Sequence, residues 1–129
     1  MPESSRIPGY IADLNEEQRR AVLHQGAPLL ILAGAGSGKT RVITVKIAYM
    51  IEQLGLDPRS ILAATFTNKA AGEMKERAAA LAPAAQDTMI RTFHSFGAWF
   101  LRRNAQLLDM PSGFSIYDDD DSVTLLRSL

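Results

Sequence analysis

A glycine-rich stretch between an apolar run and a helical pattern constrains this chain more than any other feature. Residues 29–32 are all large and apolar, glycines stand at 34, 36 and 38, and Lys39-Thr40 open an amphipathic pattern. This order predicts a strand, a loop and a helix, the arrangement of a phosphate-binding loop. The first loop position is Ala33 where the motif has glycine, a small departure because the last strand residue needs no positive φ.

The chemistry expected of this loop is the capture of a triphosphate. Glycines let successive backbone N–H groups converge on an anion, and the following helix offers its unpaired N–H groups and positive dipole end. Lys39 is predicted to reach the terminal phosphates, and the Thr40 hydroxyl to complete an Mg²⁺ shell. The alternative is a glycine-rich turn that binds nothing. The predicted site consists of Ala33, Gly34, Ala35, Gly36, Ser37, Gly38, Lys39 and Thr40.

Composition narrows the class of protein. The chain has 129 residues, enough for one domain with a real core, and 47% of them are hydrophobic. Basic and acidic residues balance at 14 each, which argues against a free-standing basic DNA binder. The absence of cysteine excludes disulfides, thiolate metal sites and cysteine nucleophiles. With no signal-like start and no membrane-length apolar run, a cytoplasmic protein without membrane contact is expected.

Turn and capping signals divide the rest of the chain. Residues 1–9 are predicted to be a flexible arm and residues 10–129 one domain. Asn15 is a good N-cap, and Gln18 three residues later predicts a capping box. Apolar spacing predicts four further helices and three further extended segments. The helices are expected over 39–54, about 68–82, about 96–108 and 122–129, and the extended segments over 60–65, 88–92 and 114–117.

Apolar spacing also predicts what is buried. Alternation of strand and helix indicates an α/β fold, a parallel sheet flanked by helices. The strand at 60–65 lacks polar alternation and is expected to be covered on both faces. Trp99 is expected in the core. The predicted buried stripes are Ile43, Ile47, Met50, Ile51 and Leu54 on one helix, and Ala71, Met74, Ala78 and Leu81 on the next.

Ligands of parallel sheets gather at the carboxyl ends of the strands, so the corners there are candidate sites. Phe66 and Phe93 each stand in such a corner among short hydroxyl and amide donors. An exposed aromatic ring beside such donors suits a single-stranded nucleic acid, whose bases stack while its phosphates accept hydrogen bonds. Composition alone slightly favours the alternative, in which both rings fold back under the following helix.

Four motifs resemble the first motifs of superfamily 1 DNA helicases of the UvrD, Rep and PcrA type. They are LNEEQ at 14–18, AGAGSGKTR at 33–41, TFTNKAAGEMKER at 65–77 and TFHSF at 92–96. Their order and spacing match the family across nearly the whole chain. The resemblance implies the N-terminal segment of a RecA-like P-loop NTPase domain from a 3′–5′ helicase that couples ATP hydrolysis to movement on single-stranded DNA.

The resemblance also implies roles for individual residues. Gln18 matches a glutamine that reads adenine, which makes the capping box its rival role. Arg41 matches an arginine lying against the base and ribose, the alternative being a solvated surface residue. Lys39 and Thr40 match the catalytic phosphate and Mg²⁺ positions. The implied DNA-binding residues are Thr65, Phe66, Thr67, Asn68, Thr92, Phe93 and His94. His94 is not expected to be a metal ligand, because no second ligand stands at a suitable spacing.

One family motif has no counterpart here, the apolar strand ending in Asp-Glu (Walker B). The acidic run at 118–121 follows a short stretch interrupted by Ser115, and we predict that it caps a helix. The sheet is therefore expected to be incomplete, with an exposed edge, and the second RecA-like domain to lie elsewhere in a parent protein. Three alternatives remain: a truncated, non-enzymatic nucleotide- or DNA-binding module, the front of a recombination helicase-nuclease, and, least favoured, a small-molecule P-loop kinase.

Overall fold

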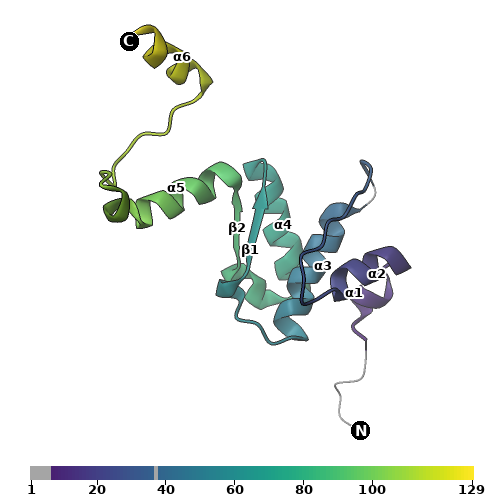
Figure 1. Ribbon diagram of the computed structural model, residues 1–129. Helices are drawn as coiled ribbons and strands as arrows, with labels where there is room; N and C mark the ends of the chain where they lie inside the picture. Colours follow the sequence, from purple (N-terminus) through teal and green to yellow (C-terminus); the bar gives the residue numbers. More distant parts are fainter. Residues whose placement is uncertain (1–6, 37) are drawn as a thin grey trace. The chain divides into compact units, whose positions relative to one another are not determined.

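The computed structural model describes residues 7–36 and 38–129, which divide into two compact units, up to Arg91 and from Thr92 to Leu129. Figure 1 labels helices and strands of both units. The helices of the first unit are α1 (Gly9–Ala12), α2 (Glu16–Leu23), α3 (Lys39–Glu52), η2 (Pro58–Ser60), α4 (Asn68–Leu81) and η3 (Pro83–Asp87). The second contains α5 (Phe93–Arg103), η4 (Ala105–Leu108) and α6 (Asp119–Arg127).

The sheet of the described chain has two strands, β1 (Leu62–Thr65) and β2 (Met89–Thr92), which lie side by side in parallel. The pairing begins just before β1, where the Met89 N–H donates to the Ile61 carbonyl at 3.2 Å. Helix α4 makes the crossover that two parallel strands require. Both strands were predicted, and the architecture agrees with a partial α/β, RecA-like fold.

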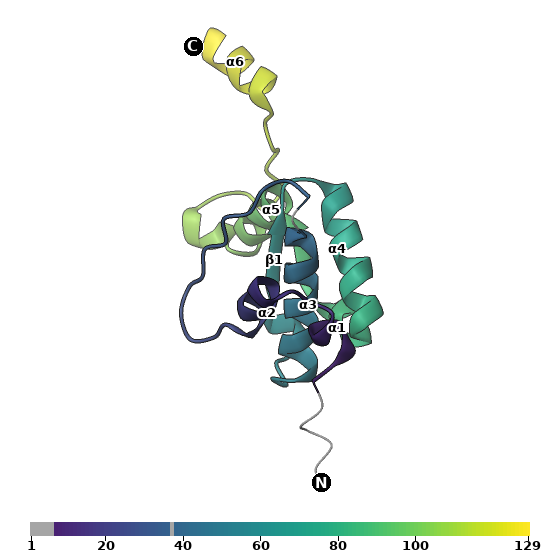
Figure 2. The same cartoon turned by 90° about the vertical axis from the view of Figure 1, so that its right-hand side faces the viewer.

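Helix α3 lies between α4 and α2 (Figure 2) and contributes side chains to two apolar clusters. One cluster joins Ile47 and Ala48 of α3 to α4, η3 and the sheet, and includes Ile61 and Met74. The other joins Val42 and Val45 to α1 and α2. The predicted single stripe on α3 is therefore partly wrong, because a helix between two layers buries two faces. Ile43 and Leu54 are exposed, whereas Val42, Val45 and Ala48 are buried.

The strand predicted at residues 29–33 is wrong. This segment forms no strand, and Leu30 and Leu32 are 80% and 88% exposed. A strand needs a neighbour for its backbone hydrogen bonds, and the segment pairs with neither β1 nor β2. It borders a cavity of about 760 Å³ between residues 24–31, α3 and β1, lined mainly by apolar side chains. Figures 1 and 2 show it as an open loop.

The other strands and helices follow the sequence more closely. Helix α4 buries Ala71, Met74 and Ala78 as predicted. The strand at 60–65 begins later, after the η2 turn, and Leu62 is 48% exposed, so coverage of both faces is wrong. The short helix α1 has no counterpart in the prediction and replaces the end of the arm predicted at 1–9, of which residues 1–6 lie outside the description.

The second unit contains two amphipathic helices. The helix predicted to reach about residue 108 ends at Arg103, where the Asn104 side chain donates to the Phe100 carbonyl at 2.8 Å. Trp99 is only partly buried and contacts Phe96, with ring centroids 6.0 Å apart, so its predicted core position is wrong. No residue of α5 or α6 is buried.

The acidic run of the second unit has the predicted capping role. Helix α6 begins at Asp119, with a capping box between Asp118 and Asp121 that places its N-terminus earlier than predicted. Residues 114–117 form no strand. Within the part of the chain that the structure describes, no helix has the length and apolarity needed to cross a bilayer.

Candidate functional site

The glycine-rich loop enters α3 through two residues with left-handed backbone conformation. Gly36 has φ of 76° and Gly38, the N-cap of α3, has φ of 82°. Such angles disfavour any residue with a Cβ, so glycine is required there. Gly38 has no side chain to cap the helix, which leaves the first N–H groups of α3 for another acceptor. Ser37, which was also predicted for this site, lies outside the described residues.

The two residues predicted to be catalytic open α3. The Lys39 ammonium folds back over the loop and donates to the Ala33 carbonyl at 3.2 Å. Thr40 is exposed in the first helical turn, and its carbonyl accepts from the Thr44 hydroxyl at 3.0 Å. Gly34, Ala35 and Gly36 are exposed as well. Backbone donors, a cation and a hydroxyl therefore occur together at this turn, a donor set that fits a phosphate and its metal ion.

Helix α2 brings Gln18 to the same loop. Asn15 and Gln18 form the predicted capping box: the Gln18 N–H donates to Asn15 Oδ1 at 2.9 Å, and the Asn15 N–H donates to Gln18 Oε1 at 3.1 Å. The other end of the Gln18 amide faces the loop, because Nε2 lies 2.8 Å from the position that a Cβ on Gly38 would occupy. The structural role of Gln18 is confirmed, and its predicted reading of adenine remains a prediction.

Arg41 follows the loop on the exposed side of α3. It lines a hollow of about 460 Å³ together with Tyr10, Asp13 and Arg77. The hollow lies among α1, α3 and α4, so Arg41 is exposed at the rim of a depression that also carries a second arginine. This placement is compatible with contact to a ligand and also with the surface role that the sequence left open.

A lysine joins α2 to α3 in a way that the sequence does not reveal. Lys46 donates to the carbonyl oxygens of Ala21, Val22 and His24, at 3.0, 3.0 and 2.8 Å. These carbonyls lie at the C-terminal end of α2, where a cation complements both the unpaired acceptors and the helix dipole. Burial lowers the pKa of Lys46. The interaction fixes the Gln18 helix against the helix that begins at the glycine-rich loop.

The corner after β1 combines a buried hydroxyl with an exposed ring. Thr65 is buried, and its hydroxyl donates to the Thr67 carbonyl at 3.1 Å. Thr67 caps α4 by accepting from the Ala70 N–H at 3.1 Å. Phe66 is 90% exposed, so it does not fold back under the helix as composition favoured. Asn68 is exposed in the first turn of α4.

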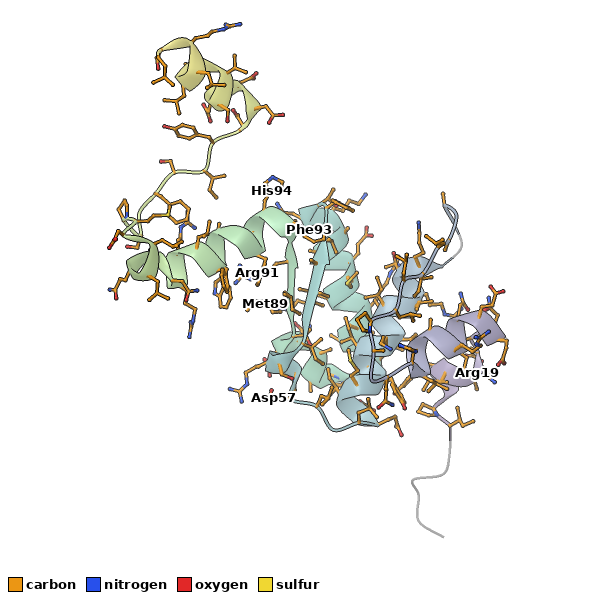
Figure 3. All side chains as sticks on the ribbon, viewed as in Figure 1. Arg19, Asp57, Met89, Arg91, Phe93 and His94 are labelled. Carbon is orange, nitrogen blue, oxygen red and sulfur yellow. The ribbon has the colours of Figure 1, made fainter. Side chains whose placement is uncertain are left out.

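The corner after β2 follows a similar plan. Thr92 is buried and caps α5, since its hydroxyl accepts from the Ser95 N–H at 3.0 Å. Phe93 is 53% exposed and His94 is exposed. Figure 3 shows both at the start of α5. Each corner therefore has a threonine hydroxyl as a helix cap, Thr67 for α4 and Thr92 for α5. The sequence patterns named both only as DNA-binding residues.

Among residues 7–36 and 38–129, no group of three His, Cys, Asp or Glu side chains comes close enough to hold a metal ion. A metal site built by such side chains alone is therefore not part of the described chain.

Comparisons with known proteins identify the family. Residues 14–129 match the model of the UvrD/REP helicase N-terminal domain. The chain is 53% identical over 128 residues to the ATP-dependent DNA helicase UvrD1 of Mycobacterium bovis, covering 98% of this chain and 17% of that protein. It is 49% identical over 118 residues to Rep of Escherichia coli, covering 90% of this chain and 18% of the relative.

A third relative gives the same assignment. PcrA of Bacillus subtilis is 46% identical over 120 residues, which cover 92% of this chain and 16% of the relative. The chain thus spans less than a fifth of the length of the curated relatives it matches. The family match over residues 14–129 spans the glycine-rich loop and both strand corners. The chain belongs to the UvrD/REP helicase N-terminal domain family.

Proposed function

We propose that this chain is the nucleotide-binding front part of an ATP-dependent 3′–5′ DNA helicase. The observation that carries the proposal is the turn into α3, where left-handed Gly36 and Gly38 precede Lys39 and Thr40. That turn has the donors expected of a P-loop, and relatives at about half identity are named ATP-dependent DNA helicases. The helicase activity is proposed for a longer parent protein, because this chain covers less than a fifth of the relatives it matches.

The loop and Lys39 share the task of holding the phosphates. Backbone N–H groups of the loop and of the first turn of α3 donate to the β- and γ-phosphates. Lys39 leaves the Ala33 carbonyl, to which it donates at 3.2 Å, and its charge then neutralises the terminal phosphates. The Thr40 hydroxyl would join the coordination shell of Mg²⁺. The bound Mg·ATP supplies the phosphoanhydride bond whose hydrolysis drives the parent helicase.

Base recognition falls to Gln18 and Arg41. Gln18 presents an amide beside Gly38, and a glutamine amide pairs well with the N6 and N7 edge of adenine. Arg41 offers a planar guanidinium at an exposed rim, suited to lie against the base or the ribose. Together these side chains would select ATP by its base after the loop has captured the phosphates.

The strand corners would contact single-stranded DNA. The exposed ring of Phe66 suits stacking with a base, and Phe93 and His94 offer further contact area at the start of α5. Thr65, Thr67 and Thr92 hold the corners in shape, because their hydroxyls are engaged with the backbone. Asn68 adds an exposed amide that can donate to phosphate.

Turnover requires more than these residues. The 129 residues hold no apolar strand ending in Asp-Glu to position the attacking water. We expect the isolated chain to bind nucleotide weakly and to hydrolyse it negligibly, because closure on a second RecA-like domain completes such sites. A steady-state ATPase assay with single-stranded DNA tests this, and strong DNA-stimulated turnover would overturn it.

Removing the positive charge of Lys39 tests the proposed nucleotide-binding site. Lys39→Ala should weaken binding of a fluorescent ATP analogue by about tenfold or more, since a charge-assisted contact to phosphate is lost. Lys69→Ala removes the same charge from an exposed position in α4 and should leave binding unchanged. Equal affinity of the Lys39→Ala chain and the unaltered chain would contradict the site.

A further inference from the structure

The side chain of Gln18 takes part in the capping box of α2 and also lies beside Gly38 of the loop. Gln18 Oε1 accepts from the Asn15 N–H at 3.1 Å, while Asn15 Oδ1 accepts from the Gln18 N–H at 2.9 Å. At the opposite end of the same amide, Nε2 stands 2.8 Å from the site of an added Cβ on Gly38. Asn15 therefore fixes one end of an amide whose other end lies at the mouth of the loop.

The Gln18 amide keeps unused hydrogen-bond donors and an unused acceptor after it has formed the capping box. A glutamine side chain offers an oxygen with two lone pairs and a nitrogen with two hydrogens. The capping box uses one lone pair of Oε1 and neither hydrogen of Nε2. One acceptor and two donors remain, and adenine presents the complementary pair, an N6–H donor beside the N7 acceptor.

Guanine does not match the fixed amide. It carries an O6 acceptor where adenine has its amino group, so Oε1 would face another acceptor. A mobile glutamine could turn its amide so that Nε2 donates to O6 or N7 of guanine, and so tolerate either base. A glutamine whose Oε1 is tied to the Asn15 N–H cannot rotate without breaking the cap.

We propose that Asn15 is a positioning residue for base selection, so that the capping box and adenine recognition act together and are not rival roles. The inference rests on the proposed contact between Gln18 and the base. Holding the side chain in advance removes part of the entropy that binding would otherwise lose. Gly38 leaves room for the amide, because a Cβ at this position would displace Nε2.

The experiment measures the ratio of ATP to GTP affinity by displacement of a fluorescent ATP analogue from the 129-residue chain. Asn15→Ala keeps the backbone N–H that binds Oε1 but removes the side-chain acceptor that closes the capping box. With the N-cap no longer held in place, the Gln18 amide should lose its fixed orientation and the ratio should fall by about threefold to tenfold. Asn15→Ser keeps an N-cap acceptor and should restore the ratio. Asp118→Ala, which breaks the capping box of α6, should leave the ratio unchanged.

A double mutant separates positioning from helix stability. In a Gln18→Ala background, Asn15→Ala should have no further effect on the ratio, because the side chain that it positions is gone. A loss of affinity that is equal for ATP and GTP in Asn15→Ala would show a merely structural cap and overturn the inference. An unchanged ratio in Gln18→Ala alone would instead overturn the proposed base contact, so the two failures are distinguishable.

Discussion

Two apolar runs of the first unit, residues 29–32 and 61–64, adopt different structures. The first is richer in large aliphatic residues, yet Leu30 is 80% exposed and the run forms no strand. The second is buried at Ile61, leads into β1 and pairs with β2. An apolar sequence therefore makes a strand possible, but the strand forms only where a neighbour pairs with its backbone.

The largest expected effect on stability comes from replacing one side chain of each run by alanine. Ile61→Ala should cost about 2–5 kcal/mol of unfolding free energy, because it removes buried volume from the cluster around α4. Leu30→Ala should stay within about 0.5 kcal/mol, since the side chain is exposed. Urea denaturation followed by circular dichroism measures both. Equal losses would mean that both runs are packed in solution, and the contrast would disappear.

A smaller loss of stability is expected from Lys46, which binds the end of α2 just before the first run. Lys46→Met keeps much of the stem but removes the ammonium that binds three carbonyls at the end of α2. The loss should be about 1.5–3 kcal/mol, because hydrogen bonds from a charged group are lost together. Thermal unfolding measures it, with Lys69→Met as the exposed control. If the two variants unfold at the same temperature, Lys46 does not hold α2 against α3.

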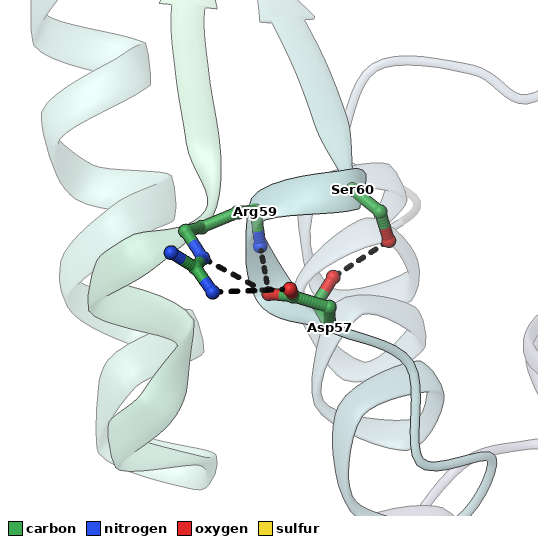
Figure 4. A network of polar contacts seen from close by, with 3 residues as sticks. All are labelled: Asp57, Arg59 and Ser60. Carbon is green, nitrogen blue, oxygen red and sulfur yellow. Dashed lines mark hydrogen bonds and ion pairs between the residues drawn. The ribbon is translucent and has the colours of Figure 1, made fainter.

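The smallest effect concerns the turn that leads into the second run (Figure 4). Asp57 accepts from the Arg59 N–H at 2.9 Å and contacts its guanidinium at 3.3 Å, and the Ser60 hydroxyl donates to the Asp57 carbonyl at 2.6 Å. The hydrogen bond from the Arg59 N–H, more than its guanidinium, lowers the pKa of Asp57. A lowered folded-state pKa stabilises the fold above about pH 3.9, and the gain is lost as the pH falls through the lower value.

Carboxyl titration by NMR checks this turn. Arg59→Ala removes the guanidinium but keeps the backbone donor, so the pKa of Asp57 should rise only part of the way to its ordinary value. Full return to the ordinary value would show that the side chain, not the backbone, sets the pKa. Global stability should barely change, because the Asp57–Arg59 pair lies at the surface, exposed to solvent.

Local signals in the sequence explain which parts were predictable. The capping box at Asn15 and the apolar spacing of the next two helices are local signals, so α2, α3 and α4 follow from them. Strands β1 and β2 were also found, because each is bounded by turn residues. The glycine-rich loop was located by its sequence motif, glycines at 34, 36 and 38 followed by Lys39-Thr40.

The remainder depends on contacts between distant residues. Lys46 binds carbonyls 22–25 positions earlier in the chain, and no local pattern marks such a lysine. The approach of Gln18 to Gly38 likewise needs the packing of α2 against α3. The two buried faces of α3 and the unpaired run at 29–32 follow from which neighbours are present, which periodicity does not encode.

The central claim is that backbone amides of the glycine-rich loop grip a triphosphate, and NMR titration of the chain with Mg·ATP tests it most directly. The account predicts that the amide signals of Gly34, Gly36 and Gly38 shift with ATP and do not shift with adenosine, because the phosphates are the ligand of this loop. If ATP binds and these glycine signals stay unchanged, the nucleotide is held elsewhere and the claim is contradicted.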